Sequence, residues 1–258
     1  MQITFLGTGP SKRIPRPNCG KWYVCKEARR PGSKSARLQT STFFEFSGSN
    51  ILVDVSQDFK KQSIPIKNKN INKIFLTHGH IDAAGGLKDL YGYGRKFGLP
   101  VVCTEQNTKQ VLIEQNLWAD FPFFEIGPFK ELAEKNLKII PFRVEHSFDS
   151  RFLTLGYLFF DGKKKIAYAS DFKKMPIKSK KLIKRADLAI LDCAAYKNPI
   201  PTHQSFPEIL KLAKELKFKK VYLTQVGIAW PHYELAQKIV ARQAKNIFLA
   251  YDGLEVKV

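Results

Sequence analysis

The sequence predicts one α/β domain, because strand-like apolar runs alternate with amphipathic helix-like segments along the chain. The strand candidates are short and rich in β-branched and aromatic residues. The helix candidates carry apolar residues three and four positions apart, most clearly in the last two. No internal repeat or domain boundary is evident, since the polar stretch 67–70 is too short for more than a loop. At 258 residues and 44% hydrophobic, the chain can bury a full core.

The expected elements follow the chain in this order. Strands are expected at Gln2–Leu6, Thr42–Phe46, Ile51–Asp54, Lys73–Leu76, Pro100–Cys103, Leu137–Phe142, Gly156–Phe160, Ile166–Ala169, Leu188–Asp192, Val221–Thr224 and Ile247–Ala250. Helices are expected at Leu87–Lys96, Gln106–Gln115, Ser179–Arg185, Phe206–Leu216 and Tyr233–Ala244.

Two histidines and an aspartate lie within five residues directly after the apolar run Ile74–Leu76, in the sequence THGHIDAAGG. A strand delivers its last residues to a sheet edge. The Gly- and Ala-rich turn that follows can then direct His78 and His80 to one cation and Asp82 to a second. The alternative, two surface histidines and a turn aspartate, is disfavoured because the other histidines also occupy patterned places.

The remaining potential ligands also follow strand-like runs. The chain has only five histidines. His146 comes directly after the run 139–145, and Asp171 follows the run 165–170. His232 lies at the start of the last expected helix, shortly after the strand Val221–Thr224.

The order of these residues resembles the metallo-β-lactamase superfamily, whose pattern is HxHxDH followed by His, Asp and His. The resemblance runs from Met1 to Val258. The segments TFLGTG, ILVDV, YASD and THQSFPEIL resemble the branch that contains the cyclic-phosphate phosphodiesterases of phosphonate catabolism, and the tRNA-maturing nucleases are more distant. The resemblance implies an αββα sandwich of two mixed β-sheets flanked by helices, with metals along one edge.

The resemblance also implies a ligand set for two divalent metal ions. His78, His80 and His146 would hold one ion; Asp82, Asp171 and His232 would hold the other, with Asp171 between them. Zinc suits these ligands, and manganese or iron are alternatives. Ala83 stands where the common pattern has a further histidine, so the second ion is expected to bind more weakly.

The same resemblance implies hydrolysis of a phosphate ester by a metal-bound hydroxide, formed because the metal lowers the pKa of its water. His203 is the expected proton donor to the leaving group, because it follows the strand Leu188–Asp192 and has no ligand role. A structural histidine held by hydrogen bonds is the alternative. Asp82 is expected to be a catalytic residue together with His203. Asp54 and Asp192 are expected to fix loops or orient ligands.

Three functions remain open. The first is a phosphodiesterase for a small or cyclic diester, the second a nuclease for RNA or single-stranded DNA, and the third a nonhydrolytic nucleic-acid-binding protein. The net charge of +20 and a pI near 9.8 keep nucleic acid as a candidate partner. Lysines and arginines cluster in two stretches, 12–37 and 173–185, which are either solvated faces or phosphate-binding surfaces.

Four irregularly placed cysteines predict free thiols in a reducing compartment. The related branch often carries a zinc-binding C-x-C-x-x-C near the N-terminus. Here only Cys19 and Cys25, with five residues between them and no spare histidine, occupy this region, so a structural zinc is the less favoured interpretation. No secretory or membrane-spanning segment is evident, so a cytoplasmic protein is expected. The aromatic segment 118–129 is expected to pack in the core; a homodimer interface and a wall beside the substrate are the alternatives.

Overall fold

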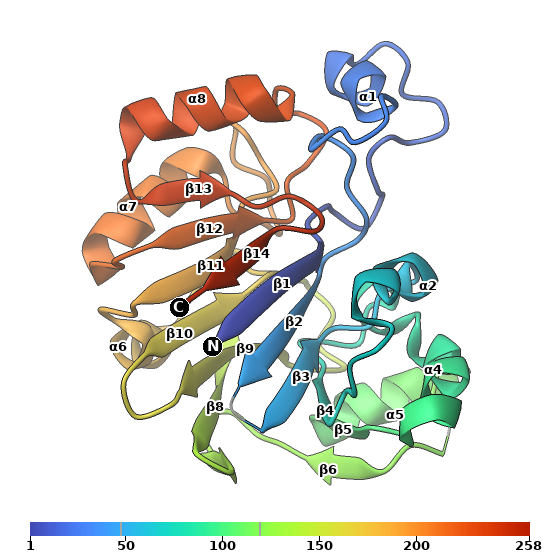
Figure 1. The fold of residues 1–258 in the computed structure, drawn as a ribbon. Helices are drawn as coiled ribbons and strands as arrows, with labels where there is room; N and C mark the ends of the chain where they lie inside the picture. The colour runs from blue at the N-terminus through green and yellow to red at the C-terminus, as the bar shows by residue number, and fades with distance from the viewer. Residues whose placement is uncertain (47, 119) are drawn as a thin grey trace.

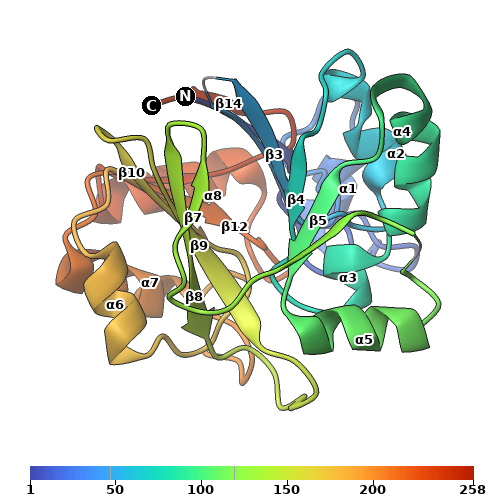
Figure 2. The ribbon, with the colours of Figure 1, turned by 90° about the horizontal axis from the view of Figure 1, so that it is seen from below.

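The structure is a computed structural model that describes residues 1–46, 48–118 and 120–258. In this part of the chain the strands form two seven-stranded sheets. The sheets lie face to face, with helices on the outer face of each, as the views in Figures 1 and 2 show. The expected αββα sandwich of mixed sheets is therefore confirmed.

The first sheet has the strand order β14-β1-β2-β3-β4-β5-β6. Its strands β14, β1, β2 and β3 are antiparallel neighbours, whereas β3 to β6 run parallel. The bounds are β1 Gln2–Gly7, β2 Ser41–Phe46, β3 Ser49–Val53, β4 Lys73–Phe75, β5 Val101–Thr104, β6 Phe123–Glu125 and β14 Glu255–Lys257.

The second sheet has the order β13-β12-β11-β10-β9-β8-β7. Here β10 to β13 are parallel, and β7 to β10 are antiparallel neighbours. The bounds are β7 Leu132–Glu134, β8 Leu137–Val144, β9 Thr154–Phe160, β10 Lys165–Ala169, β11 Leu188–Asp192, β12 Val221–Thr224 and β13 Ile247–Leu249. Because β8 and β10 both run antiparallel to β9, their carboxyl ends point to the same edge as those of β11 and β12.

The helices cover the two outer faces. Those on the first sheet are α2 Phe59–Gln62, α3 Ile81–Ala84, α4 Leu90–Phe97 and α5 Gln106–Glu114; those on the second are α6 Ile177–Ile183, α7 Phe206–Leu216 and α8 Tyr233–Gln243. The short α1, Tyr23–Ala28, lies apart in the N-terminal loop region (Figure 1). Ser205 begins α7 with a capping box to Glu208, which satisfies two backbone N–H groups at the helix start.

An aromatic core fills the space between the sheets. Phe44 of β2 packs against Phe159 of β9, with ring centroids 4.8 Å apart, and Phe75 of β4 packs against Tyr157 at 5.2 Å. All four side chains are fully buried. Burial of each such ring stabilises the fold by about 1.5–3 kcal/mol, so these contacts help to hold the two sheets together.

Several short elements were not expected from the sequence. They are α1, α2 and α3 and the three-residue strands β6, β7 and β14, which are too short to show periodicity. The aromatic segment 118–129 contains the edge strand β6. Phe121 and Ile126 are buried there, whereas Phe124 is 51% exposed. Ala119 lies outside the described residues.

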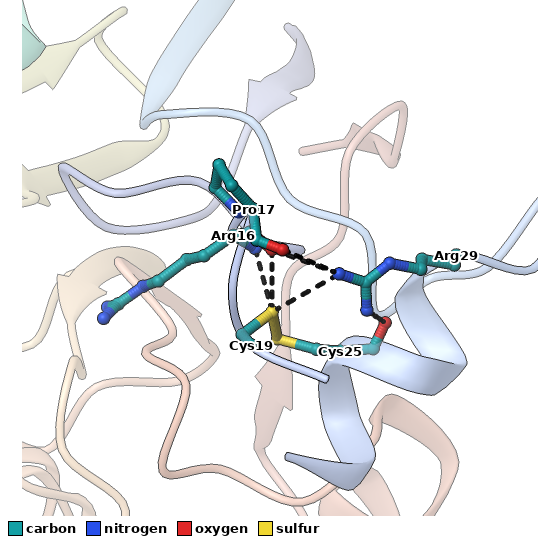
Figure 3. The surroundings of a disulfide bond; sticks show 5 residues. All are labelled: Arg16, Pro17, Cys19, Cys25 and Arg29. Carbon is teal, nitrogen blue, oxygen red and sulfur yellow. Dashed lines mark hydrogen bonds between the residues drawn. A yellow bond between two sulfur atoms is a disulfide. The ribbon is translucent and has the colours of Figure 1, made fainter. Parts of the chain in front are cut away.

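The prediction of free thiols is wrong for two of the four cysteines. Cys19 and Cys25 are joined by a disulfide, shown in Figure 3, because the first turn of α1 carries Cys25 back to Cys19. A structural zinc on these two thiols is excluded in this arrangement. Cys103 and Cys193 are free and buried. Among the described residues, no helix is long and apolar enough to cross a membrane.

Candidate metal centre

Three histidine side chains meet at the edge where the carboxyl ends of β4 and β8 lie together. Potential ligand nitrogens of His78, His80 and His146 all lie within 4.8 Å of one another. The rings of His78 and His80 are 4.6 Å apart, and those of His78 and His146 are 5.2 Å apart. The structure therefore brings together the three residues predicted to hold the first metal.

Hydrogen bonds determine which ring nitrogen of His78 and of His146 faces the centre. His146 Nδ1 lies 3.0 Å from the carbonyl oxygen of Thr202, which can only accept, so Nδ1 carries the proton. His78 Nδ1 lies 2.8 Å from Thr77 Oγ1, and that hydroxyl in turn contacts the buried carboxylate of Asp54 at 2.9 Å. A carboxylate accepts the hydroxyl proton, so the hydroxyl accepts from His78. Both rings then present Nε2 to the centre.

The environment of His78 fits a metal ion. Its Nε2 is buried and has no hydrogen-bond partner among the described residues. Burial lowers the pKa of His78 well below its ordinary value, so the ring is neutral and offers a lone pair. A buried nitrogen with no partner costs free energy, and coordination of a cation removes that cost. Burial also raises the pKa of Asp54, and a cation on His78 favours its ionised form again.

Asp171 and His203 extend the centre toward the second sheet. Ligand atoms of His146, Asp171 and His203 lie within 4.8 Å of one another. Asp171 follows β10 and is 3% exposed. Three histidines with a carboxylate beside them and a side open to a cavity are typical of a catalytic metal site.

His203 is paired with a buried carboxylate. Its Nδ1 lies 2.7 Å from Asp192 Oδ2, and Asp192 itself is held by the backbone N–H groups of Phe172 and Ala194. Burial acts to lower the pKa of His203, but the charge and hydrogen bond of Asp192 outweigh it and raise the pKa to about 9. The expectation that Asp192 orients a neighbour agrees with these contacts.

Asp82 lines the same cavity but belongs to neither ligand cluster. It lies in the first turn of α3. Burial, and then the charge of Asp171, raises its pKa to about 6. Ala83 is buried directly after it and offers no donor atom. The residues at the start of α3 thus supply fewer ligands for a second metal than the common pattern has.

The predicted role of His232 as a metal ligand is not supported by the fold. Its Nδ1 contacts Glu234 at 2.9 Å, and its ring packs against Tyr23 at 5.3 Å, at the start of α8. It lines a separate cavity with Trp22 and Leu235. The reason is chain length, since seven residues separate the end of β12 from His232, and they carry it away from the strand end.

Gln225, which the sequence analysis missed, occupies the place at the end of β12. Its Nε2 donates to Asp171 Oδ1, and its Oε1 is buried without a partner among the described residues. The backbone has a positive φ of 58°, which is uncommon outside glycine and turns the side chain inward. The signal was its position directly after a strand, which a search for histidines alone passes over.

The centre opens on a cavity of about 710 Å³. Its walls come from the loop after β1, the start of α3, the end of α5 and the loops after β8 and β11: Ser11, His80, Ile81, Asp82, Gln115, Leu117, His146, Ser147, Thr202 and His203. Such a volume suits a small organic molecule.

The lysines of the stretch 173–185 do not form an open track beside this cavity. Lys173 pairs with Glu208 at 2.6 Å, Lys180 pairs with Glu215 at 3.0 Å, and Lys178 lies over the ring of Phe129. Lys173 and Lys180 border a separate cavity of about 400 Å³ together with both glutamates. The charges of Lys173 and Lys180 are therefore balanced locally.

Replacing Thr77 with Val should weaken metal binding about 10–100-fold, the usual effect of losing such an outer partner of a ligating histidine. The valine keeps the shape but removes the hydroxyl that orients His78. Competition titration with a chromogenic chelator measures the change. Thr77→Ser, which keeps the hydroxyl, is the matched control and should bind metal like the native protein. Equal affinity in all three proteins would contradict the orienting role.

Asp192→Asn should lower the pKa of His203 in the metal-free protein, because the substitution removes the charge that raises it. The titration midpoint is expected near pH 9 in the native protein and well below that in the variant. Since the folded pKa lies above the ordinary value of about 6.5, the stabilisation from this pair is complete below about pH 6.5 and is lost as the pH rises through about 9. NMR of the imidazole C–H signals measures the midpoint. The same midpoint in both proteins would refute the pairing.

Known proteins of similar sequence or structure share this fold. A crystal structure of a diphosphatase from the PhnP family is 26% identical, with a TM-score of 0.86, over 100% of this chain and 97% of that one. Zn²⁺-bound PqqB from Methylobacterium extorquens is 17% identical, with a TM-score of 0.82 over the full length of both chains. The short form of human tRNase Z is 18% identical, with a TM-score of 0.71, over 100% of this chain and 99% of that one. The last two similarities concern the fold alone.

A curated relative, an octanoyltransferase from Porphyromonas gingivalis, is 25% identical over 266 residues, which cover 99% of this chain and 51% of the relative. The chain thus spans about half the length of that protein. The family described as the beta-lactamase superfamily domain matches residues 49–224, more than half of the chain, including both histidines of the first motif, His146, Asp171 and His203. By this match and by its two-sheet architecture, the chain belongs to the metallo-β-lactamase superfamily of metal-dependent hydrolases.

Proposed function

We propose that the protein is a metal-dependent phosphodiesterase that acts on a small phosphodiester. The observation that carries the proposal is the group of histidine nitrogens from His78, His80 and His146 beside a histidine–carboxylate pair at the wall of one cavity. Among the described residues, the buried Nε2 of His78 has no partner. A divalent cation bound by His78, His80 and His146 would supply an activated water and stabilise charge on the phosphoryl oxygens.

The role of His203 is to protonate the leaving oxygen. Asp192 holds its Nδ1, which leaves Nε2 to face the reacting group, and the raised pKa of about 9 keeps the ring protonated at neutral pH. A leaving alkoxide is strongly basic, so a donor placed beside it lowers the barrier. His203 lines the cavity together with His146, which places the donor next to the proposed metal ligand.

Two alternative functions have less support. A nuclease requires an extended cationic track, and the lysines nearest the centre are paired with glutamates or lie around another cavity. Octanoyl transfer, the activity named for the Porphyromonas relative, usually needs a nucleophile for the acyl group. Among the described residues no free thiol opens on the cavity, since Cys103 and Cys193 are buried.

His203→Ala should lower turnover of alkyl phosphodiesters by about 10²–10⁴-fold, the usual worth of a general acid. Hydrolysis of bis(p-nitrophenyl) phosphate should fall much less, because nitrophenolate leaves without a proton. Steady-state rates on both substrates and metal content per chain are the measurements. His232→Ala is the matched control and should keep native metal content and turnover. An equal fall in turnover of both substrates, or loss of metal from His203→Ala, would contradict the proton-donor role and indicate that His203 is a metal ligand or a structural residue.

The second metal ion should bind more weakly than the first, because Ala83 offers no ligand and the side-chain amide of Gln225 is hydrogen-bonded to the carboxylate of Asp171. Titration of metal into the metal-free protein, followed by native mass spectrometry, should show two unequal steps. The double variant Ala83→His, Gln225→His should tighten the weaker step by supplying two imidazoles. Two equally tight steps in the native protein would show that another group completes the second site.

A further inference from the structure

A second cavity, of about 550 Å³, adjoins the one that opens on the metal centre. The two share Ser11 and His203 on their walls, so a molecule bound at the centre can extend past His203 into the second cavity. Most of the second wall is apolar and includes Tyr196, Ile200 and Ile228, and Arg16 and Lys197 bring positive charge to it.

Arg16 is half-buried, and its guanidinium has no acceptor among the described residues. Its Nε is buried and makes no hydrogen bond among the described residues. The neighbouring arginines differ: Arg13 pairs with Asp58 at 3.1 Å, Arg30 pairs with Glu27 at 3.0 Å, and Arg29 donates to the carbonyl of Cys25. A buried cationic donor without an acceptor costs free energy. An anion bound in this cavity would remove that cost.

The backbone of Arg16 is firmly held. Its N–H donates to Cys19 Sγ at 3.0 Å, and its carbonyl accepts from Arg29 Nη2 at 3.2 Å. The disulfide to Cys25 fixes Cys19 in turn. In Figure 3 the Arg16 side chain extends away from the disulfide, and Arg16 is one of the residues that line the second cavity.

The opposite wall is also rigid. Gly227 N–H donates to the carbonyl of Ala194 at 3.1 Å, and a Cβ at Gly227 would lie 2.4 Å from that oxygen, so only glycine permits this approach of the two loops. Tyr196 packs on Trp230 at 5.0 Å. The subsite is thus formed before any ligand arrives, which reduces the entropy lost on binding.

We propose that this cavity is a subsite for the second phosphate and adjoining organic group of a diphosphate-linked substrate, with Arg16 as the residue that recognises that phosphate. The proposal rests on the phosphodiesterase function and names its substrate class. A guanidinium suits phosphate because its planar donors match two oxygens at once. The apolar wall suits an uncharged organic group beyond it.

The reaction balances as a hydrolysis. Water adds to the phosphorus at the metal centre, and the bond from that phosphorus to the bridging oxygen breaks. The bridging oxygen leaves with its electron pair as part of the second phosphate, on the side where His203 stands between the two cavities. The two protons of the water are shared among the two phosphate monoester products and solvent.

The test compares two substrates in the metal-loaded protein. Diadenosine diphosphate has a second phosphate, and bis(p-nitrophenyl) phosphate has none. Arg16→Ala should lower the ratio of kcat/KM for diadenosine diphosphate to kcat/KM for bis(p-nitrophenyl) phosphate about 10–100-fold, as expected for a charge-assisted hydrogen bond. Most of the change should be in KM for the diphosphate. Arg16→Lys keeps the charge without the planar donors. Its kcat/KM ratio should lie between those of the native protein and Arg16→Ala.

Arg30→Ala is the matched control, because it removes an exposed arginine that is paired elsewhere, and it should leave the ratio at the native value. Thermal unfolding and metal content verify that each variant is folded and loaded. An unchanged ratio in Arg16→Ala would overturn the proposal. So would a native protein that cleaves bis(p-nitrophenyl) phosphate but not diadenosine diphosphate, and that result would leave the phosphodiesterase function standing. Failure to cleave either substrate would overturn both.

Discussion

The centre depends on the bonds that hold the two sheets together at one edge. The backbone N–H of Leu155 in β9 donates to the carbonyl of Thr77 at 2.8 Å, and the hydroxyl of Tyr157 donates to the carbonyl of Leu76. These bonds join the loop after β4 to the second sheet directly before His78. Because β9 also pairs with β8, the same contact sets the distance between His78 and His146. Loss of this register would separate the ligands contributed by the two sheets.

The polar groups of the centre form two chains that start from buried carboxylates. In the first chain, Asp54 accepts a hydrogen bond from the hydroxyl of Thr77, which accepts one from His78. In the second, Asp192 accepts a hydrogen bond from His203. The first chain ends on a neutral ring whose free nitrogen faces the centre, and the second ends on a ring whose proton is retained to about pH 9. In the proposed function, similar residues therefore serve opposite purposes, His78 as a lone-pair donor and His203 as a proton donor. The difference arises because His78 is fully buried, whereas His203 lies next to a negative charge.

The N-terminal loop region gives the protein a wall that the two sheets alone do not provide. Gln39 Nε2 donates to the carbonyl of Ser11 at 2.7 Å. The backbone N–H of Arg16 donates to Sγ of Cys19 in the disulfide. Across the cavities, the backbone of Val226 donates to the carbonyl of Thr8 at 3.0 Å, which ties this region to the loop after β12. The loop region is thus part of the rim of the site, and in the proposed function its charge would select among phosphate esters.

The sequence by itself determined the architecture and identified the three histidines that come together as the candidate site of the first metal. Alternation of strands and helices is a local property, so β11, β12 and α7 were predicted to the residue. His78, His80 and His146 follow strands directly, and the carboxyl ends of strands in such a fold meet at one edge. Elements of three or four residues, such as β6 and α3, escaped prediction because they span too few residues for the pattern to repeat.

Only the tertiary structure decided the far side of the centre. His232 and Gln225 lie in the same loop, and which of them reaches Asp171 depends on the backbone turn at Gln225 and on the path past Trp230. The partners of Cys19, Arg16 and the lysines likewise come from segments distant in the chain or from turns that no periodicity reports. Side chains that act through long-range contacts carry no local signal, which is why their roles became visible only when the chain was folded.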